Sequence, residues 1–232
     1  MTPTVEITAL GNAGFAVSFD QRRLLIDPYI VELSDVPLSQ PESLHADDLI
    51  LITHSHWDHL TTGAVEVAAQ RGVKVVGPEP ARRKLGRRLP PDALTVLEPA
   101  TTGARAAARF GEVEVTAFRT LHGQGHNSYL VTFPGFRLFH DGDNEHTESL
   151  DRAALQGLDV LMICPWQGSG WVEFIEALNP GCWLLMHVTP DELAAHERKA
   201  FFPDLCDHVP LPDRLLALWP GQTVTRPRPA HP

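Results

Sequence analysis

The residues with the clearest capacity for chemistry form the segment Thr53-His54-Ser55-His56-Trp57-Asp58-His59. Three imidazoles and one carboxylate lie close together, directly after the apolar run at positions 49–52, which is typical of a buried strand. Imidazole and carboxylate groups are ligands that suit zinc and its first-row neighbours. The segment therefore predicts a metal site on the loop that leaves this strand.

Cysteine takes no part in this pattern. The three cysteines, Cys164, Cys182 and Cys206, lie far downstream and lack the C-x-x-C spacing of structural zinc sites. A site made of histidine and aspartate is the catalytic pattern, in which water occupies an open coordination position. The odd number and irregular spacing of the cysteines also indicate a reducing compartment, so we expect a cytoplasmic protein.

The composition limits the classes of partner that we expect this protein to bind. The chain has 232 residues, of which 43% are hydrophobic and 21% charged, and its formal net charge is -10. An acidic surface disfavours nucleic acid as a partner. No apolar run approaches the ~20 residues that span a bilayer, and the first residues lack a secretory pattern, so we expect no membrane partner. The basic run Arg82-Arg83-Lys84, with Arg87 and Arg88, is interpreted as a solvated helix face.

Periodicity and turn residues predict a mixture of strands and helices. In the first half we expect strands at 5–10, 15–19, 23–26, 49–52 and 73–76 and helices at 61–70 and 80–88. In the second half we expect strands at 104–110, 112–120, 128–133, 136–139, 160–163, 183–186 and 215–219, and helices at 149–156, 172–178 and 189–199. This order predicts an α/β (α+β) chain with two mixed sheets packed face to face and helices outside. No linker composition divides the chain, so we expect one domain over residues 1–232, with a frayed tail at about 226–232.

Three further histidine or aspartate side chains come just after predicted strands. They are His122, Asp143 and His187. Ligands at the ends of neighbouring strands converge on one edge of a sheet, where α/β folds commonly build their sites. The sequence therefore predicts that these residues join the histidine-rich loop.

In this order, the His-x-His-x-Asp-His segment, His122, Gly142-Asp143 and His187 resemble the metallo-β-lactamase-fold hydrolase superfamily. Gly11-Asn12-Ala13-Gly14-Phe15 and Leu25-Ile26-Asp27-Pro28 are similar to segments of its compact, lactonase-like members. The resemblance covers most of the chain. It implies a four-layer αββα sandwich with a dinuclear site at one edge.

The resemblance also implies which residues bind each of two divalent metal ions. The first ion is implied to bind His54, His56 and His122, the second Asp58, His59 and His187, and Asp143 is implied to bridge them. Zinc is the expected metal, with manganese or iron as alternatives. His126 competes with His122 for its place, and we favour His122 because it lies nearer the end of the preceding strand.

Residues around the implied ligands differ from the usual pattern of the family or have a role still open. Asn144 stands where Thr or Ser usually follows Gly-Asp, and Trp57 is bulky enough to narrow the mouth. His59 stands where true β-lactamases usually carry cysteine, so penicillin hydrolysis is not implied. His126 is predicted to be a pocket residue that donates a proton or contacts substrate; the alternative is a loop histidine bonded to backbone. Asp27 is the best candidate to support a metal-bound histidine, because such rings normally donate their other N–H to a carboxylate or carbonyl.

Two further sets of residues are interpreted by their position. His140 is expected behind Asp143. Trp166, Gln167 and Trp171 are candidates for a substrate wall, with a buried core position as the alternative for the tryptophans, favoured more for Trp171.

The predicted activity is metal-dependent hydrolysis of a small ester, lactone or phosphodiester by a metal-bridging hydroxide. Asp58 is expected to orient this nucleophile as well as to bind metal. Two alternatives stay open: a metal-dependent nuclease or phosphodiesterase acting on nucleic acid, and a non-catalytic metal-binding protein. We expect a small-molecule substrate as the partner, and the sequence leaves homo-oligomer formation open.

Overall fold

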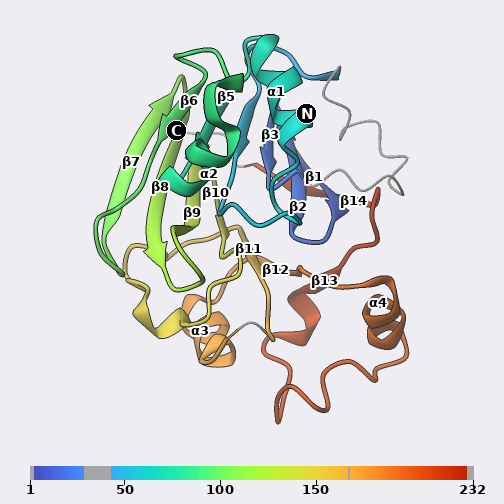
Figure 1. The fold of residues 1–232 in the computed structure, drawn as a ribbon. Helices are drawn as coiled ribbons and strands as arrows, with labels where there is room; N and C mark the ends of the chain where they lie inside the picture. The colour runs from blue at the N-terminus through green and yellow to red at the C-terminus, as the bar shows by residue number, and fades with distance from the viewer. Residues whose placement is uncertain (1–2, 29–42, 167, 229–232) are drawn as a thin grey trace. The chain divides into compact units, whose positions relative to one another are not determined.

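The structure is a computed structural model that describes residues 3–28, 43–166 and 168–228 (Figure 1). The described residues divide into two compact units. The first unit comprises residues 3–98 and 219–228, and the second comprises residues 99–218. The prediction of a single domain stays a prediction.

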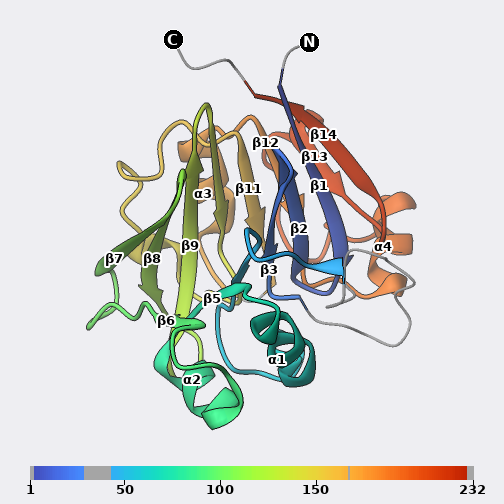
Figure 2. The same ribbon diagram turned by 90° about the horizontal axis from the view of Figure 1, so that it is seen from above.

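The first unit is built on one seven-stranded mixed sheet in the order β14-β1-β2-β3-β4-β5-β6. Its strands are β1 (Thr4–Gly11), β2 (Gly14–Phe19), β3 (Arg22–Ile26), β4 (Leu49–Leu51), β5 (Lys74–Gly77), β6 (Leu94–Val96) and β14 (Thr223–Pro227). Pairing is antiparallel from β14 to β3 and parallel from β3 to β6. Strands β1, β2 and β3 lie side by side in Figure 2. All three residues of β4 are buried, as expected for a strand in the parallel part of a sheet.

Two helices accompany this sheet. Helix α1 (Thr62–Gln70) buries Val65, Ala68 and Ala69 in a cluster with residues of β4 and β5. Helix α2 (Glu79–Leu85) has proline in its first turn, where a missing backbone N–H costs nothing, and continues as a 3-10 turn at Gly86–Arg88. The helix predicted at 80–88 is therefore confirmed up to Leu85, and Gly86, with a φ of +61°, ends the α-helical turns.

The second unit is built on another seven-stranded mixed sheet in the order β13-β12-β11-β10-β9-β8-β7. Its strands are β7 (Arg105–Phe110), β8 (Val113–Thr120), β9 (His126–Phe133), β10 (Phe136–His140), β11 (Val160–Ile163), β12 (Cys182–Leu185) and β13 (Leu215–Ala217). Pairing is antiparallel from β7 to β10 and parallel from β10 to β13. Its helices are α3 (Trp171–Leu178) and α4 (Pro190–Glu197), with 3-10 turns at Thr147–Ser149 and Pro212–Arg214.

Strand polarity determines which loops meet within each unit. In the first sheet, β1, β3 and β4 run in the same direction, so the loops that follow them leave the same edge. In the second sheet, β8 and β10 are both antiparallel to β9, and β10, β11 and β12 are parallel. The ends of β8, β10 and β12 therefore share one edge, and β9 begins there.

The helix predicted at 149–156 does not form. After the 3-10 turn Thr147–Ser149 the chain makes successive turns up to Gly157, which has a φ of +71°. Oδ1 of Asp151 accepts hydrogen bonds from the backbone N–H groups of Ala153 and Ala154 at 3.0 and 3.3 Å. A short acidic side chain that bonds its neighbouring backbone in this way favours a turn over a helix interior.

The structure adds two strands that the sequence did not predict, β6 and β14. Strand β14 pairs with β1 up to Pro227, so the sheet extends into the segment predicted to be frayed. Among the described residues, no helix has both the length and the apolar character that crossing a membrane requires.

Candidate metal centre

The histidine-rich loop of the first unit follows β4 directly. The backbone N–H groups of His59 and Leu60 both point to the carbonyl of His56, at 3.3 and 3.1 Å, so the loop closes into a tight turn. This turn brings donor atoms of His54 and His56 within 4.8 Å of each other, and it does the same for Asp58 and His59. The local sequence therefore gathers four predicted ligands in one short loop.

A buried carboxylate supports this loop from the end of β3. Asp27 is fully buried, and its Oδ1 accepts a hydrogen bond from the backbone N–H of Thr53 at 2.7 Å. Its Oδ2 accepts one from Oγ1 of Thr53 at 2.5 Å and lies 2.7 Å from Nδ1 of His59. Asp27 has a φ of +43°, a left-handed conformation that aspartate tolerates better than most residues. The structure thus places Asp27 in the supporting position that the sequence suggested.

These contacts determine which ring nitrogens can bind a cation. A carboxylate only accepts hydrogen bonds, so Nδ1 of His59 must donate and Nε2 keeps its lone pair. The hydroxyl of Thr53 gives its proton to Asp27, so it accepts from Nδ1 of His54, 3.0 Å away. Both histidines therefore present Nε2 as the donor atom, in the arrangement in which the other ring nitrogen is held by a hydrogen bond.

Asn12, in the turn after β1, holds the fourth residue of the loop. Its Nδ2 donates to the backbone carbonyl of Asp58 at 3.0 Å and to Oδ2 of Asp58 at 3.3 Å. Asn12 has a φ of +51°, a left-handed backbone conformation that most other residues adopt only at a conformational cost. Sequence reasoning did not assign this role, although Asn12 lies within one of the segments that carried the family resemblance.

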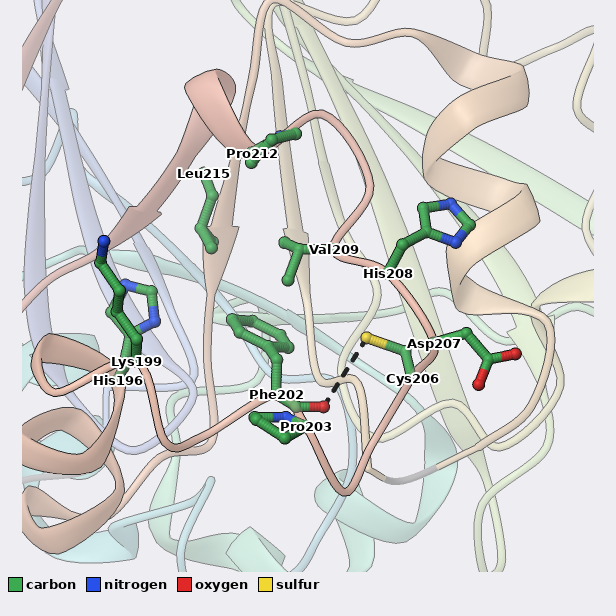
Figure 3. A pocket seen from close by; sticks show the side chains of 10 residues that line it. All are labelled: His196, Lys199, Phe202, Pro203, Cys206, Asp207, His208, Val209, Pro212 and Leu215. Carbon is green, nitrogen blue, oxygen red and sulfur yellow. Dashed lines mark hydrogen bonds between the residues drawn. The ribbon is translucent and has the colours of Figure 1, made fainter.

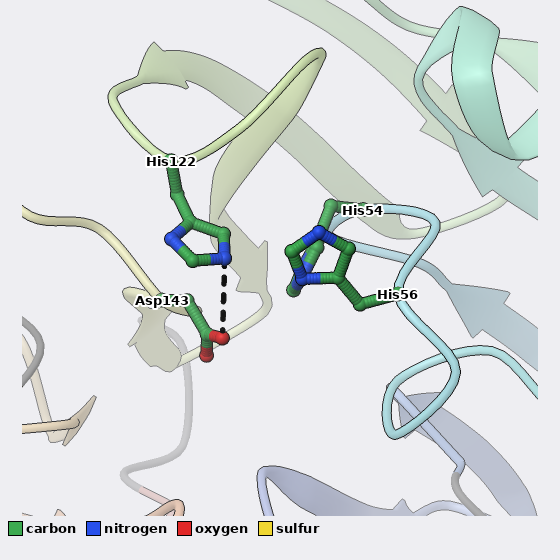
Figure 4. Close-up of side chains that lie close together, drawn as sticks. All are labelled: His54, His56, His122 and Asp143. Atoms are coloured by element: carbon green, nitrogen blue, oxygen red, sulfur yellow. Dashed lines mark ion pairs between the residues drawn. The ribbon is translucent and has the colours of Figure 1, made fainter.

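The second unit brings together three predicted ligands from three strand ends. Nε2 of His122 lies 3.6 Å from Oδ2 of Asp143, as the dashed line in Figure 4 shows, and Nε2 of His187 lies 3.5 Å from the same oxygen. Ligand atoms about 2.0–2.1 Å from one zinc ion lie roughly 3.3 Å apart in a tetrahedral site. The separations in this unit are close to that value, so the three groups are spaced as metal ligands are.

His122 is oriented by a residue that the sequence did not single out. Oε1 of Glu145 lies 3.0 Å from Nδ1 of His122, so this nitrogen donates and Nε2 faces Asp143. The backbone N–H of Glu145 donates to the carbonyl of Leu121 at 2.8 Å, which ties the two loops together. The signal that would have identified Glu145 is its position two residues after Asp143, beside another strand end.

His126 holds the backbone of Asp143. The N–H of Asp143 donates to Nε2 of His126 at 2.9 Å, and Nδ1 of His126 lies 2.7 Å from Oγ1 of Thr120. His126 is fully buried. Both ring nitrogens are engaged with the protein, which favours the backbone-bonded histidine that the sequence left as the alternative. The role of His126 as a proton donor or substrate contact stays a prediction.

The loop that carries Asp143 contains a second buried carboxylate, Asp141. Burial raises the pKa of Asp141 to about 7, although hydrogen bonds from Asn144 and Ser128 act in the opposite direction. Nδ2 of Asn144 donates to Oδ1 of Asp141 at 3.1 Å, so the asparagine that departs from the family pattern orders this loop. His140 is fully buried, and its Nδ1 accepts from the backbone N–H of Gly142 at 3.2 Å.

His187 occupies a strained position after β12. Its φ is +60°, a left-handed conformation that is uncommon for residues other than glycine, although histidine adopts it more often than most. Helix α4 begins directly afterwards with a capping box between Thr189 and Glu192. The ring of Trp166 contacts His187 with centroids 6.1 Å apart. Such strain persists only where the surrounding structure demands it, which is typical of functional positions.

The predicted substrate-wall residues have different surroundings. Trp171 is buried in the core of the second unit, which agrees with its alternative interpretation as a core tryptophan. Trp166 is partly buried against the same core and touches His187. Trp57 is 71% exposed in the ligand loop, and Gln167 lies outside the described residues.

The donors of both units fit divalent metal ions. Each unit presents imidazole and carboxylate groups at one sheet edge, and hydrogen bonds to Nδ1 leave Nε2 as the donor atom of His54, His59 and His122. Figure 4 shows the side chains of His54 and His56, whose rings contact each other with centroids 4.3 Å apart. This combination of ligand type and outer support is the one that zinc and related metals require.

Comparison with known proteins identifies the family. The model of the beta-lactamase superfamily domain matches residues 22–196, which is more than half of the chain. The chain belongs to the beta-lactamase superfamily. A UPF0173 metal-dependent hydrolase of Thermococcus onnurineus is 43% identical over 72 residues, which are 31% of this chain and 30% of that protein. A UPF0173 metal-dependent hydrolase of Rubrobacter xylanophilus is 28% identical over 225 residues, covering 84% of this chain and 89% of that protein.

Solved structures agree with this assignment. Igni18, a metallo hydrolase from Ignicoccus hospitalis, matches with a TM-score of 0.70 and 20% identity over 96% of this chain and 98% of that chain. The metallo-beta-lactamase fold protein YhfI from Bacillus subtilis matches with a TM-score of 0.66 and 14% identity over 97% of this chain and all of its own. The predicted α/β fold class of the metallo-β-lactamase type is therefore confirmed.

Proposed function

We propose that this protein is a metal-dependent hydrolase with a dinuclear centre. The observation that carries the proposal is the approach of Nε2 of His122 and Nε2 of His187 to one oxygen of Asp143, at 3.6 and 3.5 Å. At 3.5 and 3.6 Å the two imidazoles are too far from this carboxylate oxygen for a strong hydrogen bond, so direct contact explains little of the arrangement. They gain much more when a cation lies among them, which is why we assign these residues to metal binding.

We propose that two ions bind and that Asp143 bridges them, as the family resemblance implies. The proposed ligands are His54, His56 and His122 for the first ion and Asp58, His59 and His187 for the second. The family match from residue 22 to residue 196, which includes all seven positions, supports this proposal. Zinc is the proposed metal because imidazole and carboxylate donors suit it, with manganese or iron as alternatives.

When bound, two divalent ions supply a water whose pKa falls towards 7 and polarise the oxygen that gains charge in the reaction. The residues of this chain contribute orientation. Asn12 holds Asp58 by two contacts, so the carboxylate is placed to align the attacking water. Asp27 and Glu145 hold the rings of His59 and His122 in the donor orientation. Each of these contacts fixes a ligand before substrate arrives, which lowers the cost of assembling the site.

The proposed substrate is a small ester, lactone or phosphodiester. The relatives carry the name metal-dependent hydrolase, which names no substrate. A nucleic-acid substrate is less favoured. The chain carries a net charge of -10, and three of the five basic residues of α2 and the turn after it contact other groups of the protein. Arg82 pairs with Glu79, Arg88 pairs with Glu66, and Lys84 donates to the carbonyl of Ser55 at 2.6 Å.

Metal content and activity test the proposal together. We expect freshly purified protein to contain close to two equivalents of divalent metal by elemental analysis. Removal of the metal with a chelator should abolish hydrolysis of aryl esters, lactones and bis-aryl phosphodiesters, and addition of zinc or manganese should restore it. Metal binding without hydrolysis of any of these substrates would favour the non-catalytic alternative.

Two substitutions and a matched control make the test specific. Asp143→Asn and His187→Gln should each lower both metal content and turnover, because each removes a donor from the cluster. His208→Gln is the control, since His208 is also paired with a carboxylate, Glu176 at 2.8 Å, but is exposed and far along the chain from the ligand motifs. If the Asp143 and His187 variants retain full metal content and turnover, the assignment is wrong.

A further inference from the structure

The second unit contains a cavity of about 690 Å³ beside β13, shown in Figure 3. Its lining comes from the end of α4, the segment that follows it and the start of β13. This volume lies within the range of pockets that bind small molecules. The described residues that line it include none of the seven proposed metal ligands, so the cavity belongs to a different site.

One wall of the cavity is apolar and rigid. Phe202, Val209 and Leu215 lie along it (Figure 3). Phe202 is 8% exposed, and its ring packs against Trp171 and Trp183 with centroids 6.3 and 6.2 Å apart. A wall held by the aromatic core does not collapse into the cavity, so an apolar ligand would bind without rearranging it.

The lining also includes Lys199, which has an unusual backbone conformation. Its φ is +59°, and its backbone N–H donates to the carbonyl of His196 at 2.8 Å, just after α4 ends. Glycine is the usual residue at a left-handed position after a helix, and another residue has a conformational cost there. A lysine at this position holds a positive charge beside the cavity in spite of that cost.

The other polar groups of the cavity do not oppose an anion at Lys199. The side chain of Asp207 extends to the side of the cavity away from Lys199 (Figure 3). His208 is engaged by Glu176. Burial and the neighbouring Asp207 raise the pKa of the Cys206 thiol, so it stays neutral. Burial lowers the pKa of His196, although the charge of Glu197 acts in the opposite direction, so the ring is neutral near pH 7 and can still donate a hydrogen bond.

We propose that this cavity binds a small amphipathic carboxylate. Its apolar chain would lie against Phe202, Val209 and Leu215, and its carboxylate would pair with Lys199 and accept a hydrogen bond from His196. The arrangement follows the general form of ligand pockets, in which apolar walls provide affinity and a few polar groups fix orientation. The proposal is independent of the hydrolase activity, because it uses none of the metal ligands.

Octanoate is a suitable probe, with octanol and octylammonium as matched compounds that lack the negative charge. Binding to the full-length protein is measured by titration calorimetry and by tryptophan fluorescence, since Trp171 and Trp183 lie behind Phe202. We expect octanoate to bind more tightly than either matched compound.

Two adjacent cationic residues provide the control. Lys199→Gln should weaken octanoate binding roughly three- to tenfold, in keeping with the loss of one partly exposed charge pair. Arg198→Gln removes the same charge one residue earlier, at an exposed position that does not line the cavity, and should leave binding unchanged. Val209→Trp should abolish binding by filling the cavity, and a thermal melt confirms that each variant is folded.

Three results would overturn the proposal. The first is the absence of octanoate binding at millimolar concentrations. The second is octanol or octylammonium binding as tightly as octanoate, which would indicate an apolar cavity or an acidic site. The third is an equal loss of binding in the Lys199 and Arg198 variants, which would indicate a general effect of charge.

Discussion

Nδ1 of His59 lies 2.7 Å from Oδ2 of Asp27, and both side chains are fully buried. The same carboxylate accepts the hydroxyl proton of Thr53, whose oxygen then faces Nδ1 of His54. One aspartate at the end of β3 therefore sets the proton positions of two histidines that we assign to different metal ions. Asp27 therefore influences the metal centre directly, although it lies well before the ligand motif in the sequence.

The first prediction concerns this aspartate. Asp27→Asn should lower zinc affinity by roughly 10- to 100-fold, because the amide can donate where the carboxylate only accepts, and the histidine tautomers are no longer fixed. The measurement is a competition titration against a chelator, with circular dichroism to confirm folding. Asp48→Asn is the control, since Asp48 is also buried but accepts from Arg23 and from the backbone of His45. The two variants should both lose stability, and equal zinc affinities would contradict the role of Asp27.

The second prediction separates the two roles of His126. If His126 only holds the backbone N–H of Asp143, His126→Ala should lower stability by about 1–3 kcal/mol and weaken metal binding, because a buried donor loses its acceptor. The pH profile of the remaining turnover should keep its shape. His126→Gln restores an acceptor and should recover much of the loss. Loss of one limb of the pH–rate profile in both variants would instead support the proton donor predicted from the sequence.

Local sequence signals predicted the ligand-bearing strand ends well. The apolar run of β4 followed by the His-x-His-x-Asp-His segment is a local pattern, and so is an apolar strand before His187. The residues that orient the ligands were harder to predict. Glu145 reaches His122 only because β8 and β10 end at the same edge, and this depends on strand order, not on spacing along the chain.

The errors in secondary structure have the same origin. The helix predicted at 149–156 fails because the side chain of Asp151 captures neighbouring N–H groups, a competition that hydrophobic periodicity does not report. Strand β14 pairs with β1 from the far end of the sequence, and its pairing partner Thr4 cannot be read from local pattern. Its position at the edge of the sheet also tolerates Pro227, which a central strand would not.

A third prediction uses two glycines of the first unit. A Cβ at Gly14 would lie 2.7 Å from the backbone oxygen of Asp27, whereas a Cβ at Gly63 in α1 meets nothing within 4 Å. Gly14→Ala should therefore destabilise the protein by about 1–3 kcal/mol and displace Asp27. Gly63→Ala should stabilise it by about 0.5–1 kcal/mol, because alanine is the better helix former. Urea denaturation measures both, and equal effects of the two substitutions would refute the close packing of β2 against Asp27.

The last prediction concerns Trp57, which is 71% exposed between two proposed ligands. A large aromatic side chain gains little from exposure to water, so we expect it to pack against apolar substrates at the mouth of the site. Trp57→Ala should raise KM for naphthyl esters about three- to tenfold while leaving kcat and the hydrolysis of methyl acetate unchanged. Val67→Ala is the control, because Val67 is an exposed apolar residue of α1 outside the ligand loop. If the variant still hydrolyses the naphthyl ester with an unchanged KM, Trp57 takes no part in substrate recognition. That result would not count against the metal centre. Loss of turnover on both esters would show instead that Trp57 supports the ligand loop.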